Sequence, residues 1–350
     1  MFMRGKVVTV IKRSVLVVLI LIAGFVIFNW ELVTYGIRQA RGQLHIIWNA
    51  KPVDEYLADP AFPDSLKTKL RLIAEVRRFA IDSLGLKDTD NYKTLYDQKG
   101  EELMWVVTAC EPFQLKPKEW DFPILGAVPY KGFFNKDRAI ALAKELKKDN
   151  WDVSIRNPGG WSTLGWFTDP ILSKMLERSE GDLASLIIHE MSHATIFVKD
   201  SVDFNENLAS FIGDRGAEQF LISKYGEESL EYITFINEDE DYVRYVNHIL
   251  GGTRRLDSLY TAMADAPVEK KIELKREAIQ HIINTMDTLT LASGKRPSVR
   301  FKEELPNNAY FMGFIHYQSN QDELIQEWKQ TFDGDLKAYI QFLSDKYPFL

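Results

Sequence analysis

Two histidines and a glutamate stand together in residues 189–193, which read HEMSH and so have the HExxH spacing. On an α-helix, side chains four residues apart project from one face, so His189 and His193 can bind a single metal ion. Zinc bound in this way lowers the pKa of a water ligand, and a neighbouring carboxylate can accept the proton as that water attacks a carbonyl group. The pentad therefore predicts a zinc-dependent peptidase with Glu190 as the general base.

The residues around the pentad support this prediction. From Asp182 to Phe197 the chain is mostly apolar and contains no proline, which predicts a buried helix with Asp182 as its N-cap. The alternative is a core helix whose two histidines hydrogen-bond internally and whose glutamate has no chemical role. A buried glutamate needs a partner, however, and a metal-bound water would be one. By residue frequencies, a chance HExxH is expected in about one chain of this length in a hundred.

A zinc site needs at least one more protein ligand. The metzincin motif would place glycine and histidine at positions 196 and 199, where this chain has Ile196 and Lys199. A second helix is predicted over residues 203–217, and on it Glu206 shares a face with three small residues, Ala209, Ser210 and Gly213. Small side chains permit a close approach of two helices. We therefore predict that this helix packs on the HExxH helix and brings Glu206 to the metal as the third ligand.

Alternatives remain open for Glu206. Asp203 and Glu206 also fit a capping box, in which Glu206 would only bond the start of its helix. The third ligand would then be another acidic residue, such as Asp214. Cysteine is a poor candidate, because Cys110 is the only one in the chain. We expect it to be a small buried residue, and its isolation excludes an intramolecular disulfide.

Several blocks of the sequence together resemble the bacterial putative aminopeptidase family. They are residues 161–173 (WSTLGWFTDPILS), the HEMSH pentad, and Phe204-Asn205-Glu206 with Ala209. A fainter likeness extends over most of the chain after the N-terminal apolar segment, including residues 128–134 and 307–309. The resemblance implies a gluzincin-like zinc peptidase. It also implies that His189, His193 and Glu206 are the zinc ligands and that Glu190 is the catalytic base.

The N-terminus predicts attachment to a membrane. Four basic residues within positions 1–13 precede an uncharged run, residues 14–30, of about 17 residues, which is just long enough for a span. By the positive-inside rule, residues 1–13 are cytoplasmic, residues 14–32 form a single-pass signal anchor in the bacterial inner membrane, and the catalytic domain is periplasmic or extracellular. A cleaved signal peptide is the alternative, but no small-x-small site follows the apolar core.

The pattern of the remaining chain predicts an α+β fold with a zincin-like layout. We expect a helical region over residues 33–100 and a metallopeptidase domain over residues 101–350. That domain would contain a β-rich lobe, the active-site helix and a helical C-terminal lobe. The lobe would contain one helix, over 136–148, and strands near 104–108, 124–130, 153–155 and 162–167. Residues 162–166 are our candidate for a sheet edge that binds an extended peptide, with an ordinary internal strand as the alternative.

Hydrolysis also needs a hydrogen-bond donor for the developing oxyanion. Asn307, Asn308, Tyr310 and the pair His316-Tyr317 are candidates in the C-terminal lobe, although packing in the core is the common fate of such aromatic residues. The expected partners are a peptide or protein substrate and the membrane. A net charge of −7 argues against nucleic acid as a partner.

Two rival hypotheses are an endopeptidase of the same fold and a membrane-tethered protein with a purely structural zinc. Glu190 weighs against the second rival, because a structural site needs no base.

Overall fold

The computed structural model describes residues 2–122, 126–158, 168–198, 201–294, 296–318 and 321–347. They form a mixed α/β structure in which helices predominate. The chain divides into two compact units, Met1–Asn49 and Ala50–Leu350.

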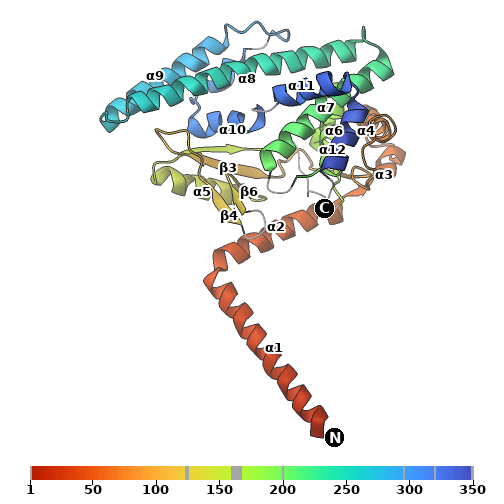
Figure 1. Ribbon diagram of the computed structural model, residues 1–350, viewed down its shortest axis with the longest axis vertical. Coiled ribbons are helices and arrows are strands. Elements are labelled where there is room, and N and C mark those ends of the chain that lie inside the picture. The colour runs from red at the N-terminus through yellow and green to blue at the C-terminus, as the bar shows by residue number, and fades with distance from the viewer. Residues whose placement is uncertain are drawn as a thin grey trace. The chain divides into compact units, whose positions relative to one another are not determined.

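The first unit consists of the helices α1 (Phe2–Phe28) and α2 (Trp30–Asn49), which Figure 1 shows in red and orange. Their axes differ by 93° across the break at Asn29. Among the residues described, neither helix alone meets the length and hydropathy of a membrane span, whereas Lys12–Phe28 and Trp30–Asn49 meet them together as a bent pair. The continuous helix expected over residues 14–32 is therefore interrupted, because the chain changes direction at Asn29.

The second unit begins with β1 (Lys51–Pro52), α3 (Val53–Ala58), α4 (Asp64–Asp82) and β2 (Thr94–Tyr96). The region expected to be wholly helical thus also contributes strands. β2 pairs antiparallel with β1 and parallel with β8 (Ile171–Leu172), which directly precedes the segment that carries the pentad. The amphipathic α4 buries Leu70, Ile73 and Val76 and packs on the HExxH helix.

A second small sheet has β3 (Trp105–Cys110) at its centre, with β6 (Lys131–Phe133) and β7 (Asp152–Arg156) antiparallel on either side. Helix α5 (Lys136–Lys148) packs against it and has the predicted bounds. Apolar residues from both elements form the core here: Val107, Ala109, Ala139, Ala143, Leu146 and Val153. The strands predicted near 104–108 and 153–155 are therefore confirmed.

The strand expected over residues 124–130 is described from residue 126 on, and it ends earlier than predicted. β5 (Gly126–Val128) pairs antiparallel with β4 (Trp120–Phe122), and the strand ends before Pro129, which has no N–H for a ladder. The predicted strand over residues 162–167, including the candidate peptide-binding edge, lies outside the described residues.

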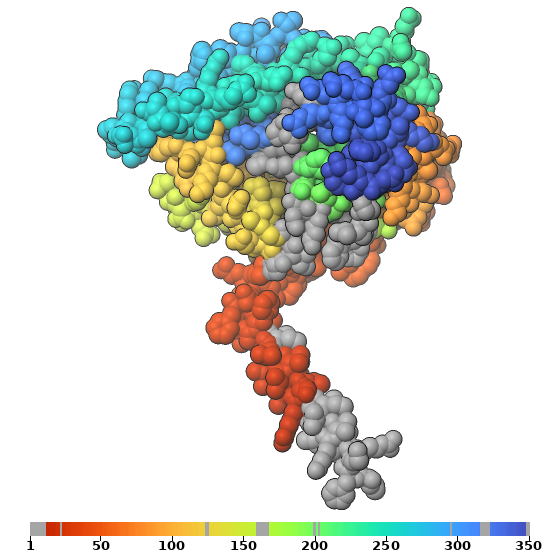
Figure 2. Space-filling model, in the orientation of Figure 1, coloured from red at the N-terminus to blue at the C-terminus, as the bar shows by residue number. Residues whose placement is uncertain are grey.

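Beyond β8 the chain is helical, as expected. The elements are η1 (Ser173–Glu177), α6 (Glu180–His193), α7 (Val202–Tyr225), α8 (Leu230–Ala262), α9 (Val268–Met286), η2 (Pro297–Phe301), α10 (Asn308–Gln318), α11 (Gln321–Phe332) and α12 (Leu336–Lys346). Helix α10 lies between the β3 sheet and α8 (Figure 1), and buried residues such as Leu256, Ile282 and Phe311 join it to α8 and α9. Figure 2 shows α8 and α9 as a layer along the top of the second unit.

Candidate metal centre

The HExxH pentad lies at the C-terminal end of α6. The helix begins one turn earlier than expected, because the Ser179 hydroxyl accepts a hydrogen bond from the Asp182 N–H at 3.3 Å and so is the N-cap. The prediction of Asp182 as N-cap is wrong: its carboxylate forms an ion pair with Arg178 at 2.7 Å. The helix also ends at His193 rather than Phe197, since the Thr195 and Ile196 N–H groups both donate to the Ser192 carbonyl.

Helix α6 is buried along most of its length, as predicted. Leu183, Ile187 and Ile188 are inaccessible to solvent. Among the polar residues of the pentad, His193 at 6% and Glu190 at 9% exposure share this burial, whereas His189 is half-buried. Polar side chains are costly to bury without partners, so this part of α6 requires a compensating interaction.

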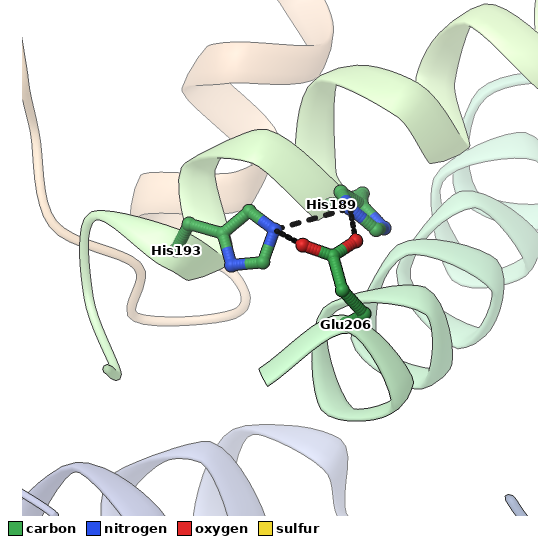
Figure 3. Close-up of side chains that lie close together, drawn as sticks. All are labelled: His189, His193 and Glu206. Carbon is green, nitrogen blue, oxygen red and sulfur yellow. Dashed lines mark hydrogen bonds and ion pairs between the residues drawn. The ribbon is translucent and has the colours of Figure 1, made fainter. Parts of the chain in front are cut away.

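Helix α7 delivers Glu206 to the pentad. The helix begins at Val202, which makes Glu206 its fifth residue and places it beyond the N3 position of a capping box. The capping interpretation is therefore wrong for Glu206, although the side chain of Asp203 lies outside the described set. Figure 3 shows the Glu206 carboxylate pointing from α7 toward both imidazoles.

The small residues of α7 set its distance from α6, as predicted. A Cβ atom on Gly213 would stand 2.8 Å from the Ser185 carbonyl oxygen and 3.1 Å from the His189 Cβ. One on Gly216 would meet Ile188 at 3.0 Å. Only glycine permits this approach, which brings the α7 backbone close enough for Glu206 to reach the histidines.

The connection between the two helices is fixed by Asn205. Its side-chain oxygen accepts from the Val198 N–H and its nitrogen donates to the Val198 carbonyl, both at 2.8 Å. Asn205 is 4% exposed, so these bonds are shielded from water. No specific sequence signal indicates this role of Asn205, apart from its position next to the candidate ligand.

The three candidate ligands meet at distances that suit a tetrahedral ion. The Nε2 atoms of His189 and His193 are 3.2 Å apart, and the Glu206 carboxylate oxygens lie 3.4 Å from the His193 Nε2 and 3.6 Å from the His189 Nε2. Zinc ligands at about 2.0–2.2 Å in tetrahedral geometry are separated by about 3.3–3.6 Å. These residues can therefore hold a metal ion.

The surroundings set the charge of the three groups. Burial, reinforced by the neighbouring His189, lowers the pKa of His193 to about 4, so this imidazole is neutral at pH 7. Burial tends to raise the pKa of Glu206, but the hydrogen bond to His189 and the charges of both histidines outweigh it and lower the pKa. Burial also opposes the charged form of His189, yet contact with Glu206 and the charge of Glu190 raise its pKa. Glu206 is therefore ionised, as a metal ligand must be.

A second layer of polar groups lies behind His189. The Ser210 hydroxyl is 3.4 Å from the His189 Nδ1, and the Ser185 hydroxyl donates to the Asp214 carboxylate at 2.7 Å. Burial raises the pKa of Asp214 to about 6. Asp214 therefore accepts a hydrogen bond from Ser185. Among the described residues, the group that could hold a metal consists of His189, His193 and Glu206, so the structure does not support Asp214 as the third ligand. Sequence reasoning found Ser210 only as a small residue and missed Ser185.

Tyr92 is a further residue near the pentad that the sequence did not indicate. Its backbone has a φ of 62°, and its N–H donates to the Asp169 carbonyl at 2.8 Å. The side chain is 3% exposed. Burial raises the pKa of Tyr92 well above its usual value, and the charges of Glu190 and Asp169 add to the effect. A buried non-glycine residue with positive φ is uncommon, and such residues cluster at functional sites.

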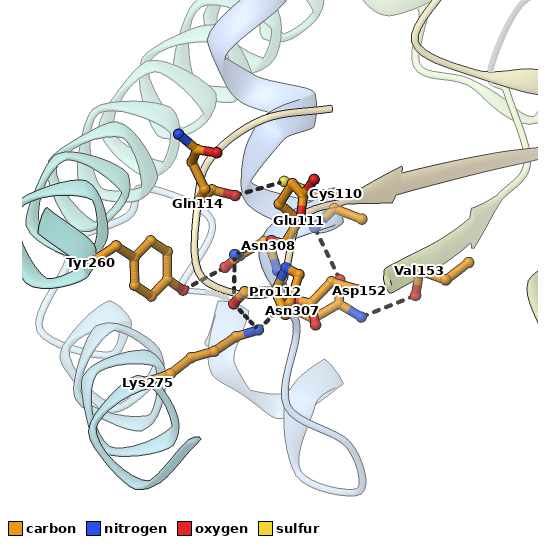
Figure 4. Close-up of polar contacts among 11 residues, drawn as sticks. Cys110, Glu111, Pro112, Gln114, Asp152, Val153, Tyr260, Lys275, Asn307 and Asn308 are labelled. Carbon is orange, nitrogen blue, oxygen red and sulfur yellow. Dashed lines mark hydrogen bonds and ion pairs between the residues drawn. The ribbon is translucent and has the colours of Figure 1, made fainter. Parts of the chain in front are cut away.

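The asparagines proposed for the oxyanion have a structural role instead. Asn308 is fully buried, accepts from the Tyr260 hydroxyl at 2.6 Å and donates to the Glu111 carbonyl at 2.8 Å, while Asn307 donates to the Val153 carbonyl at 3.0 Å (Figure 4). These bonds hold the start of α10 against the β3 sheet and α8.

Among the remaining candidates, Tyr310 has its described contacts away from the metal centre. The Tyr310 hydroxyl contacts Arg300 and Tyr245, and the side chains of His316 and Tyr317 lie outside the described set. Cys110 is buried, as expected, and burial raises the pKa of its thiol to about 12, so it stays protonated and is no nucleophile.

A comparison with protein families gives a match over most of the chain. A family model described as putative aminopeptidase matches residues 34–345, which is most of the chain. No curated protein matches the chain, and no solved structure matches it.

Proposed function

The chain belongs to the putative aminopeptidase family, and on that premise we propose that it is a zinc-dependent peptidase of the gluzincin type. In this proposal His189, His193 and Glu206 hold one zinc ion per chain, and Glu190 is the general base. One observation carries it: residues from two helices converge at the separations of a tetrahedral metal site.

The donor set favours zinc. Two imidazole nitrogens and one carboxylate are the ligands of a common catalytic zinc site, whereas magnesium and calcium prefer oxygen ligands throughout. A structural zinc site usually has four protein ligands, and three are present in the described group. A fourth position is thus left for water or substrate.

Each residue of the centre has its own role in the proposed reaction. Zinc, when bound, polarises the scissile carbonyl and makes a water molecule more acidic. The Glu190 carboxylate accepts the proton of the attacking water and gives it to the nitrogen of the leaving amine. His193 is neutral at pH 7 and offers its Nε2 lone pair, while the ionised Glu206 offsets part of the metal's charge. Burial of the pentad keeps bulk water away from these groups.

The location and the fold class belong to the same proposal. We place the second unit on the outer side of the bacterial inner membrane, with α1 as the anchor. The uncharged residues 14–30 follow basic residues, and large apolar side chains of α1 from Val15 to Phe28 are exposed. A zincin-like arrangement accords with the observed order of sheet, HExxH helix and later helices. Removal of N-terminal residues from peptides is the activity that the family description suggests.

The test combines metal analysis with a peptide-library digest of the full-length protein and two variants. Glu190→Gln removes the proton acceptor and keeps its size, so zinc should remain near one per chain while hydrolysis falls by roughly 10²- to 10⁴-fold. The control is Glu218→Gln, on α7, which loses an ion pair with Arg215 and changes the acceptor of the Tyr232 hydroxyl, and it should digest peptides at the parent rate.

The products decide between the related hypotheses. Release of single N-terminal residues indicates an aminopeptidase, and internal cleavage indicates an endopeptidase. Unchanged turnover by zinc-loaded Glu190→Gln would rule out the proposed base. If the zinc-loaded parent cleaves no peptide in the library, that result would support the hypothesis of a purely structural zinc.

A further inference from the structure

One face of α2 carries an exposed apolar stripe. Trp30, Ile37 and Trp48 are 62%, 62% and 76% exposed. They are separated by seven and eleven residues, and at 3.6 residues per turn they therefore lie within about 20° of one line. The stripe extends over about 27 Å, nearly the whole helix, at 1.5 Å per residue. Large apolar side chains aligned in this way mark a binding surface.

The angle between α1 and α2 indicates what this surface meets. The two axes differ by 93°, and the break at Asn29 follows directly on the apolar run of α1 (Figure 1). A helix that crosses a bilayer lies near the membrane normal, with an average tilt of about 20°. A second helix at a right angle to it must then run nearly parallel to the membrane plane. Trp30 begins that helix where the span ends, at the level of the lipid headgroups.

The composition of the face fits the headgroup region. Tryptophan is enriched at membrane interfaces, because its ring is apolar and its N–H can bond to headgroups or water. Arg38 is exposed beside the stripe and Arg41 is exposed on it, one turn after Ile37, and their long stems can follow apolar surface while the guanidinium groups remain in water. Glu31 is the only acidic residue of α2. Apolar side chains flanked by basic ones are typical of helices that lie on a bilayer.

We propose that α2 lies flat in the membrane interface and inserts the side chains of Trp30, Ile37 and Trp48 among the lipids. The proposal rests on the anchoring by α1 proposed above. A bilayer is favoured over a protein partner, because the stripe continues directly from the apolar helix that would be embedded.

Cysteine accessibility tests this placement in the full-length protein. The background is Cys110→Ala, which removes the only natural cysteine. Ile37→Cys lies on the stripe, and Gly36→Cys is its matched control, since Gly36 is also exposed and has no atom within 4 Å of a built Cβ. The two positions differ by about 100° around the helix. Leu19→Cys reports on the anchor.

Each variant is reconstituted into vesicles of phosphatidylethanolamine and phosphatidylglycerol and treated with a charged, membrane-impermeant maleimide. A charged reagent is excluded from the apolar region, so Ile37→Cys should react about tenfold more slowly than Gly36→Cys, and Leu19→Cys should be protected. Protection of Leu19→Cys with equal, fast reaction at positions 36 and 37 would overturn the placement of α2 and leave the anchor intact.

Two further outcomes would also overturn the placement. Fast reaction of Leu19→Cys would remove the anchor together with this inference, without bearing on the metal centre. Protection of Ile37→Cys that disappears as the protein is diluted in lipid would assign the stripe to a second copy of the chain.

Discussion

His189 is held by groups outside the set that would bind the metal. The Ser210 hydroxyl lies 3.4 Å from its Nδ1, so the Nε2 is left to face Glu206 and His193. Metal-binding histidines commonly have such a second partner, which fixes the tautomer and the orientation of the ring. The geometry of the centre therefore depends on residues that bind no metal themselves.

The variant Ser210→Ala should weaken zinc binding by about tenfold, because it removes the polar group at the His189 Nδ1. The free energy of unfolding should change little, since Ser210 is half-buried and alanine favours the helix. Ser223→Ala, at an exposed position of α7, is the control. Zinc competition against a chromophoric chelator measures both, and equal affinities in the two variants would show that the Ser210 contact has no role.

Asp214 should make stability depend on pH. Burial raises its pKa to about 6 in the folded protein, above the value of about 3.9 in an unfolded chain. A carboxyl group whose pKa is raised by folding costs stability once it ionises, so the penalty is absent below pH 4 and complete above pH 6. Asp214→Asn removes the penalty. In EDTA this variant should be more stable than the parent at pH 7.5, and the difference should vanish toward pH 4. Urea titrations at the two pH values test this, and a constant difference would contradict it.

The sequence predicted the candidate ligands but not the groups behind them. The i, i+4 spacing of His189 and His193 has a definite meaning on any helix, so their convergence follows from local geometry. The contact between Ser210 and His189, and that between Ser185 and Asp214, depend on how far α7 is rotated against α6. Tyr92 lies in a loop and has itself a positive φ, and no periodic sequence pattern predicts such a residue near the pentad.

At the level of the elements, the packing of α6 on α7 determines whether the centre can form. The Ser185 carbonyl oxygen would stand 2.8 Å from a Cβ on Gly213, and this contact involves backbone that has little freedom to move. Any side chain at position 213 must push the helices apart. Glu206 lies two turns away on α7 and would move with it.

The variant Gly213→Ala should therefore lower the free energy of unfolding by about 1–3 kcal/mol and weaken zinc binding. Gly313→Ala is the matched control, because Gly313 also lies in a helix, α10, and has no atom within 4 Å of a built Cβ. There the gain in helix propensity should raise stability by up to about 1 kcal/mol. Urea denaturation of both variants measures the difference. A Gly213→Ala protein as stable as the parent would disprove the close packing.

The elements with a strong local pattern were predictable, and the weak ones were not. α5 has its predicted bounds because Asn135 caps it and its apolar residues repeat at helical spacing. Strands β1, β2 and β8 have two or three residues each, too few for any alternation. Their pairing joins segments far apart in the chain, such as Leu95 with Ile171, and it depends on tertiary packing. The N-cap of α6 was misplaced because Ser179 and Asp182 both fit the role.

At the scale of the whole molecule, the proposed anchor α1 would leave the second unit outside the membrane. The full-length protein should remain in the membrane fraction through a carbonate wash, and protease added on the outer side should digest the second unit. Immunoblots of the fractions measure both. A soluble mature form that begins after residue 24 would contradict the anchor and favour the cleaved signal peptide.

The sequence predicted the apolar run of the proposed anchor but not the bend between α1 and α2. Hydropathy alone defines where a span can begin and end, whereas the direction of α2 depends on the backbone at Asn29.

A zinc competition titration of the full-length protein tests whether Glu206 completes a zinc site with His189 and His193. The parent should bind one zinc per chain, and Glu206→Ala, which removes a proposed ligand of the metal, should bind it at least about 100-fold more weakly. Glu218→Ala, which removes another carboxylate of α7, should bind zinc as the parent does. Near-parental affinity in Glu206→Ala would show that the third ligand is another residue.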